Sequence, residues 1–125
     1  MSIQESNKLI AEFMGAKVEN KFVLLESRRY ALSVKNYPTQ LQYHRSWEWL
    51  MPVVEKIGVL RVKSLASYNP DLMFRIEIVN GYTAIEGTGT TIFFSSSIEG
   101  SMLTATYKAV LQFIQWYNSQ PSNTK

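Results

Sequence analysis

The chain has 125 residues, of which 46% are hydrophobic and 18% are charged, so it is long and apolar enough to fold as one globular domain. It contains no cysteine, which excludes a disulfide scaffold, thiol catalysis and every cysteine-based zinc site. Its net charge of +3 is mildly basic and lacks the clustered excess of lysine and arginine that is typical of strong nucleic-acid binders.

The sequence also predicts the cellular compartment of the protein. No apolar run reaches the roughly 18 residues that a membrane-spanning helix needs. The chain starts with MSIQE, which lacks the basic start and the apolar stretch of a signal peptide. We therefore expect a small soluble, cytoplasmic protein that makes no membrane contact, and the lack of cysteine fits a reducing compartment.

The first expected element is a helix over residues 2–14. Ser2 and Glu5 have the spacing of a capping box, in which each side chain accepts a hydrogen bond from the other residue's backbone amide. Gly15 then supplies the left-handed residue that often ends a helix.

Two strands are expected next, over residues 17–26 and 30–34. Arg28 and Arg29 lie near the turn between them. The sequence Asn-Tyr-Pro at 36–38 then breaks the pattern.

A second helix is expected over residues 46–57, with Ser46 as its N-cap and Gly58 at its end. Pro52 has no amide hydrogen, so we expect a bend within this helix. Trp49 falls at the edge of the helix's apolar stripe. Two interpretations of this tryptophan stay open, core packing and an exposed contact with a partner. The stripe itself consists of residues at helical spacing: Trp47, Leu50, Met51, Val54 and Ile57.

The clearest local pattern in the chain is a hairpin. Two alternating runs, 72–79 and 82–86, flank an Asn-Gly pair, which favours a type I′ turn because both of its central positions need a positive φ. A two-residue loop fixes the register of the two strands. This register predicts an ion pair between Arg75 and Glu86 on the face that points away from the core.

Two more strands and a last helix complete the pattern. Strands are expected over 59–65 and 90–96. In the second of these, apolar residues follow one another from Ile92 to Phe94, which indicates an inner strand or one that is partly covered on both faces. The helix, over 102–118, has an apolar stripe so wide that it needs contact on two sides.

The expected order of elements is α-β-β-α-β-β-β-β-α, with antiparallel tight connections. The fold class is therefore α+β, with a single antiparallel β-sheet and three helices packed mainly on one face. We expect a single domain over residues 1–118 and a flexible C-terminal tail over 119–125.

Three blocks of the sequence carry a family resemblance. They are NKLIAEFMG at 7–15, YHRSWEWLMPVVEKI at 43–57 and YKAVLQFIQWYN at 107–118, and together they cover 36 of the 125 residues. They resemble short uncharacterised proteins encoded by Bacteroidetes-group bacteria and their phages. The resemblance implies a phage or mobile-element setting, and hence a bacterial host cytosol if a phage encodes the chain. It implies no activity, cofactor or catalytic residue, and residues 58–100 lie outside it.

Candidate catalytic groups are few. His44 is the only histidine, and its position just before a helix favours a structural or surface role over general-base chemistry. The acidic pairs Glu48 with Glu55 and Glu77 with Glu86 are favoured as solvated charges, because no acidic motif surrounds them. The Gly-Thr-Gly-Thr run at 87–90 lacks the lysine of a phosphate-binding loop and predicts a turn. We predict no catalytic residue, no cofactor and no metal site.

The favoured function is that of a non-enzymatic binding protein of phage or mobile-element type, which acts through macromolecular interaction in counter-defence or as a replication accessory. Its expected partner is an unknown protein, and a homo-oligomer is a further expectation. The expected contact surface combines aromatic anchors with basic side chains. It consists of Arg28, Arg29, Tyr43, His44, Arg45 and Trp49.

The alternative is a nucleic-acid-binding protein that uses a basic sheet face or loop. Arg61, Lys63 and Arg75 would contact phosphates there, with Tyr82 or Trp49 as a stacking platform. Glu77 and Glu86 would partly neutralise the same face, which weighs against this alternative.

Overall fold

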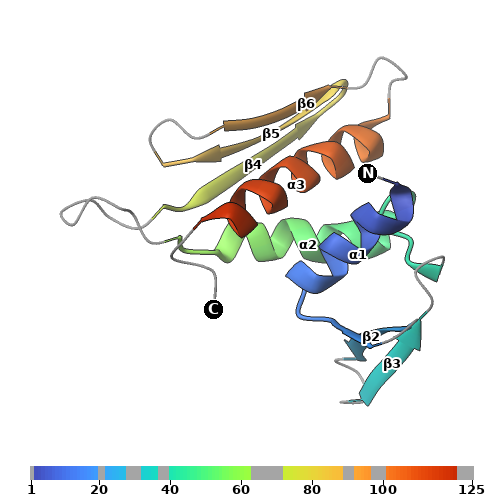
Figure 1. Cartoon of the computed structure of the whole chain (residues 1–125). Helices are drawn as coiled ribbons and strands as arrows, with labels where there is room; N and C mark the ends of the chain where they lie inside the picture. The colour runs from blue at the N-terminus through green and yellow to red at the C-terminus, as the bar shows by residue number, and fades with distance from the viewer. Residues whose placement is uncertain are drawn as a thin grey trace.

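The computed structural model describes residues 2–19, 22–27, 32–36, 40–62, 72–88, 92–96 and 101–120. The chain order of its elements is shown in Figure 1. They are α1 (Ile3–Phe13), β1 (Lys17–Glu19), β2 (Phe22–Ser27), β3 (Leu32–Asn36), α2 (Trp47–Val59), β4 (Phe74–Val79), β5 (Tyr82–Gly87), β6 (Ile92–Ser96) and α3 (Met102–Ser119). The expected tail begins within the last turn of α3, and residues 121–125 lie outside the described residues.

The α+β class is confirmed, and all strand pairs between named strands are antiparallel. The described strands form two three-stranded sheets, β1-β2-β3 and β4-β5-β6, where the sequence led us to expect one. Each sheet is built from strands that are adjacent in the sequence, and α2 lies between the two groups in the chain. Figure 1 shows the β4–β6 sheet on one side of the helices and β2 and β3 on the other.

The predicted hairpin register is confirmed residue by residue. Arg75 pairs with Glu86 across β4 and β5, and Val79 pairs with Tyr82 next to the turn. The guanidinium and the carboxylate lie 3.9 Å apart, both exposed, as the alternation of the strands requires. Gly81 has a φ of 99°, the left-handed conformation that the turn needs.

The helix boundaries follow the sequence with one exception. The Ser2–Glu5 capping box is present at the start of α1. At the end of α2 the prediction was wrong, because the helix continues through Gly58 to Val59. The predicted strand over 59–65 is accordingly absent from its described part, where only Val62 makes an isolated antiparallel bridge, to Leu72.

The apolar face of α2 is rotated from the one we expected. Val53 is fully buried, whereas Met51, which the stripe included, is exposed. Leu50, Val54 and Ile57 are buried as predicted. The face is rotated because α2 contacts both β4 and α3, and this arrangement buries the Val53 side of the helix.

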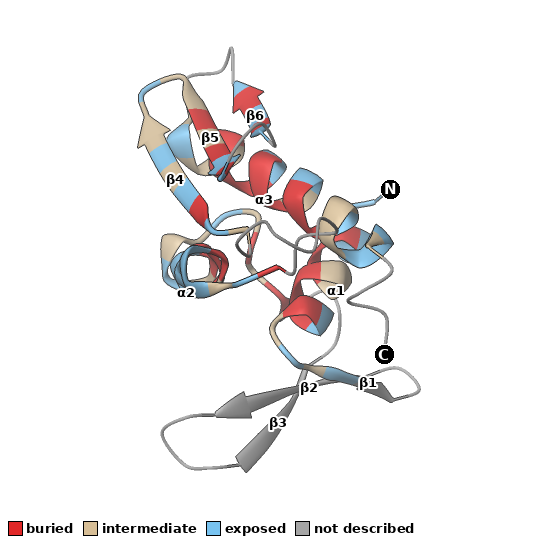
Figure 2. Cartoon of the chain, turned by 90° about the vertical axis from the view of Figure 1, so that its left-hand side faces the viewer, coloured by how far each residue is buried: buried red, intermediate tan, exposed pale blue. Residues whose placement is uncertain are grey.

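The main core lies between α3 and the β4–β6 sheet. Phe113 on α3 is fully buried and makes edge-to-face contacts with Phe74 of β4 and Phe93 of β6. Thr106 of α3 is hydrogen-bonded to Thr83 of β5 at 2.8 Å, which satisfies two buried hydroxyls. The helices α1 and α2 cover the other side of α3 (Figure 2), so all three helices lie on one face of this sheet.

Replacement by alanine should have opposite effects on stability at Gly58 of α2 and at Gly81 of the β4–β5 turn. Gly81→Ala should lower the free energy of unfolding by about 1–2 kcal/mol, because its φ is strained for any residue with a Cβ. Gly58→Ala is the matched control and should raise it by up to about 1 kcal/mol, because alanine is the better helix former. The new Cβ would meet Ile76 Cδ1 at 3.7 Å, an ordinary contact. Urea unfolding of both variants checks this, and a loss of stability in Gly58→Ala would contradict the helical assignment.

Candidate functional site

Four of the six residues predicted for a contact surface lie in or beside the segment that enters α2. Tyr43 is only 4% exposed and packs edge-to-face on Trp49, with ring centroids 5.2 Å apart. Burial raises the pKa of Tyr43 to about 12, which suits a core residue. Trp49 and His44 are partly exposed. Arg45 is exposed, and its guanidinium donates a hydrogen bond to the side-chain oxygen of Gln42. Arg28 and Arg29 lie outside the described residues.

A buried polar network lies directly beneath this segment and is centred on Asn7 of α1. The Asn7 side chain is 1% exposed, and its Nδ2 donates a hydrogen bond to the Leu41 carbonyl oxygen at 3.1 Å. The same Nδ2 lies 2.9 Å from His44 Nδ1. The Tyr107 hydroxyl of α3 donates to Asn7 Oδ1 at 3.0 Å. One side chain thus links α1, the 41–44 segment and α3.

This network assigns a proton position to His44. A carbonyl oxygen accepts hydrogen bonds only, so the nitrogen of the Asn7 amide must be the atom that faces Leu41. That nitrogen is a donor, and His44 Nδ1 must therefore accept, which leaves the proton of the neutral ring on Nε2. Burial, and then the charge of Arg45, lower the pKa of His44. The histidine is held neutral as part of the structure.

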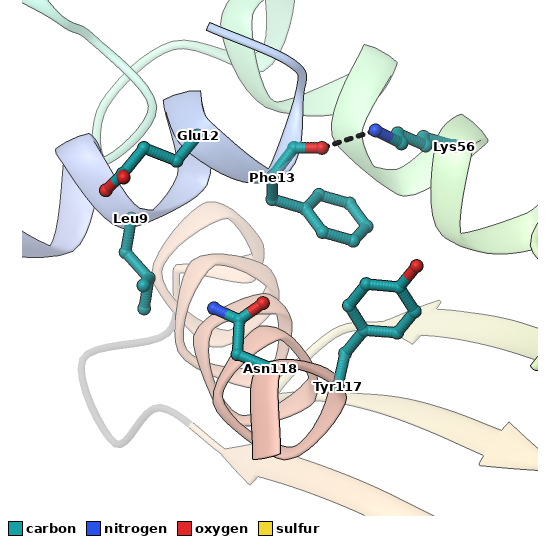
Figure 3. Close-up of a pocket in the computed structure, with 6 residues that line it drawn as sticks. All are labelled: Leu9, Glu12, Phe13, Lys56, Tyr117 and Asn118. Atoms are coloured by element: carbon teal, nitrogen blue, oxygen red, sulfur yellow. Dashed lines mark hydrogen bonds between the residues drawn. The ribbon is translucent and has the colours of Figure 1, made fainter. Parts of the chain in front are cut away.

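A hollow of about 280 Å³ opens between the ends of α1 and α3 and the side of α2 (Figure 3). Lys56 Nζ donates a hydrogen bond to the Phe13 carbonyl and lies 4.6 Å from the centroid of the Phe13 ring. The last carbonyls of α1 have no partner within the helix and carry its negative dipole end, so the ammonium stabilises that end. Burial lowers the pKa of Lys56. No local pattern predicts this contact, because the lysine and the carbonyl are 43 residues apart in the chain.

The face of the β4–β6 sheet opposite α3 carries apolar side chains that the sequence led us to place elsewhere. Ile92 is 58% exposed and Phe94 is 53% exposed, both on β6. The ring of Phe94 stacks on Tyr82 of β5, with centroids 5.3 Å apart and planes at 29°. We expected this strand to be an inner one or to be partly covered on both faces, and among the described strands it is not an inner one, because it pairs with β5 alone. We define these three residues, Tyr82, Ile92 and Phe94, as the open-face patch.

Charged groups of β4 and β5 lie beside the open-face patch. The Tyr82 hydroxyl donates to a Glu77 carboxylate oxygen at 2.8 Å, and this hydrogen bond is the main cause that raises the pKa of Tyr82. Arg75 and Glu86 form their ion pair on the same face. The described strands therefore place one guanidinium and two carboxylates there.

In the described ranges, no group of three or more histidine and acidic side chains is placed to hold a metal ion. No helix of the described chain is both long and apolar enough to cross a membrane. Comparisons of the chain with known protein families, with curated proteins and with solved structures give no match.

Removal of the Asn7 side-chain amide should destabilise the fold. Asn7→Ala removes the hydrogen bonds that the amide makes to the buried Leu41 carbonyl and to the Tyr107 hydroxyl, so the free energy of unfolding should fall by about 2–4 kcal/mol. Gln4→Ala is the control, since Gln4 is an exposed residue of the same helix and its loss should change stability by less than about 0.5 kcal/mol. Chemical denaturation of both variants measures this. Equal effects would show that the network does not stabilise the fold.

The neutral His44 predicts a pH dependence. Because folding lowers its pKa, the unfolded chain takes up the proton first as the pH falls. The stability that His44 contributes is complete above its ordinary pKa of 6.5 and is lost as the pH falls through the lower pKa of the folded chain. Between about pH 7.5 and 5.5, wild type should lose more stability than His44→Gln, whose side chain is neutral throughout. Identical slopes in the two proteins would rule the mechanism out.

Proposed function

We propose that the chain is a non-enzymatic binding protein that acts by contact with another protein chain through the open-face patch. The observation that supports this most directly is the exposure of Ile92 and Phe94 beside a stacked tyrosine. Large apolar side chains gathered on a surface and rimmed by polar groups are typical of interaction sites. A few residues contribute most of the binding energy at such sites, and tyrosine is one of the residue types enriched among them.

The absence of enzymatic activity is part of the proposal. It is supported by the use that the fold makes of His44, the only histidine of the chain. Its Nδ1 is engaged by the Asn7 amide, which is itself held by Leu41 and Tyr107. A histidine whose ring nitrogen accepts from an amide is fixed in orientation but lacks the carboxylate partner that a general base commonly uses.

The setting that we propose is a phage or mobile element in a bacterial host cytosol, as the resemblance of the three sequence blocks implies. Within that setting a counter-defence protein or a replication accessory would each act by covering a surface of its partner. An exposed sheet face fits that action, because it needs no moving part and no bound group.

The alternative partner, a nucleic acid on the sheet face, has less support. The described charges on that face are two carboxylates and one guanidinium, whereas a phosphate track needs an excess of positive charge. The surface around Arg28, Arg29, Tyr43, His44, Arg45 and Trp49 remains our second proposed contact region. The buried Tyr43 reduces what this region offers to a partner, and Arg45 is its exposed described member.

A photo-crosslinking experiment separates these possibilities. Benzoyl-phenylalanine would replace Tyr82 on the sheet face, Arg45 on the second region and Glu55, an exposed residue of α2, as the control. The proposal predicts a discrete protein adduct in host cells from position 82 that position 55 does not give. An adduct from position 45 alone would move the site to the second region. A nuclease-sensitive adduct from position 82 would establish the nucleic-acid alternative instead.

A further inference from the structure

The strand that carries the exposed apolar residues is also an edge of its sheet. In the described part of the chain β6 pairs with β5 alone, so one side of its backbone has hydrogen-bonding groups directed outward. Natural proteins usually protect such an edge with charges, proline or a bulge. β6 has the sequence IFFSS, without charge or proline, whereas β4 at the other edge carries Arg75 and Glu77. The five described residues of β6 therefore carry neither a charge nor a proline that would protect this edge against pairing.

An antiparallel pair of two β6 strands is self-complementary. If a two-fold axis passes through Phe94, the middle residue of β6, then Phe94 faces its own copy and Ile92 faces Ser96 of the other chain. On the open face the aromatic rings of both copies then form one row, Tyr82–Phe94 continued by Phe94–Tyr82. The pair brings no like charges together within the strand, because β6 has none.

The position of α3 permits this pairing. α3 packs mainly on β5 and β6 (Figure 2), so its axis lies near the line between these two strands. With strands about 4.8 Å apart, two copies joined through β6 place their α3 axes about 10 Å apart. Packed helices are about 8–10 Å apart, so the two helices meet without a clash and without a gap.

The side of α3 that would face the second copy is polar and already exposed. α2 contacts β4 and lies at the other side of α3, which leaves Lys108, Gln112 and Gln115 on the exposed side. Phe113 contacts Phe93, so Gln112 lies at the level of the proposed axis. A glutamine amide has both a donor and an acceptor, so the two Gln112 side chains that meet there can hydrogen-bond to each other. Lys108, one turn away along α3, is kept apart from its copy.

We infer that the chain forms a symmetric dimer in which β6 pairs with β6 of a second copy to make one continuous six-stranded sheet. The inference goes beyond the proposed function, since the dimer doubles the open-face patch that we propose as the binding surface. A monomeric chain with a partner crosslinked at position 82 would refute the dimer and leave the proposed function standing.

Cysteine crosslinking tests the register, because the native chain has no cysteine to interfere. Directly opposite residues of an antiparallel pair have Cα atoms about 4.5–5.5 Å apart, within the reach of a disulfide. Phe94→Cys alone should give a covalent dimer on mild oxidation. Ile92→Cys and Ser96→Cys should crosslink when mixed and far less when each is oxidised alone. Met73→Cys, which is 49% exposed beside β4, is the control and should stay monomeric on a denaturing gel.

Sedimentation of the uncrosslinked protein gives the second readout. Wild type and Met73→Lys should sediment as dimers whose fraction rises with concentration. Phe94→Lys places two ammonium groups at the axis and should sediment as a monomer with an unchanged circular dichroism spectrum. A monomeric wild type, or a dimeric Phe94→Lys, would overturn the inference. So would a cysteine series in which position 94 crosslinks no better than position 73.

Discussion

The structure depends above all on the packing of α3 against one face of the β4–β6 sheet. Phe113 fills the centre of this contact against Phe74 and Phe93, and the remaining buried residues of α3 extend it along the helix. α1 and α2 then cover the other side of α3, so all three helices are used on the same face of the sheet. As a consequence, the described helices leave the opposite face uncovered. The exposure of Ile92 and Phe94 thus follows from where the core is built.

A second constraint joins the helical layer together. The Asn7 amide is the meeting point of α1, the 41–44 segment and α3, and its three polar contacts span the chain from residue 7 to residue 107. A buried amide with all of its partners in place specifies one arrangement of these elements, because any displacement leaves a polar atom unsatisfied. This explains why the only histidine and the aromatic residues around it serve the structure. The network that stabilises the helical layer is therefore separate from the sheet face that we propose for binding.

The sequence predicted what local chemistry determines. The capping box at Ser2 and Glu5 and the register set by the Asn-Gly turn, including the Arg75–Glu86 pair, each depend on residues close together in the chain. Gly58 was misjudged because contact with the sheet and with α3 carries the helix past a residue that commonly ends one. The place of β6 at an edge was missed because strand order depends on the whole sheet. The Asn7 network was missed for the same reason, since its partners are 34 or more residues away.

If β6 pairs with β6 of a second copy, amide hydrogen exchange should report the pairing. Backbone amides of β4 and β6 would be followed at several protein concentrations, with β4 as the internal reference because it is the other edge of the same sheet. We expect exchange in β6 to slow as the concentration rises, while exchange in β4 does not change. Exchange in β6 that is independent of concentration, or slowing that is equal at both edges, would contradict it.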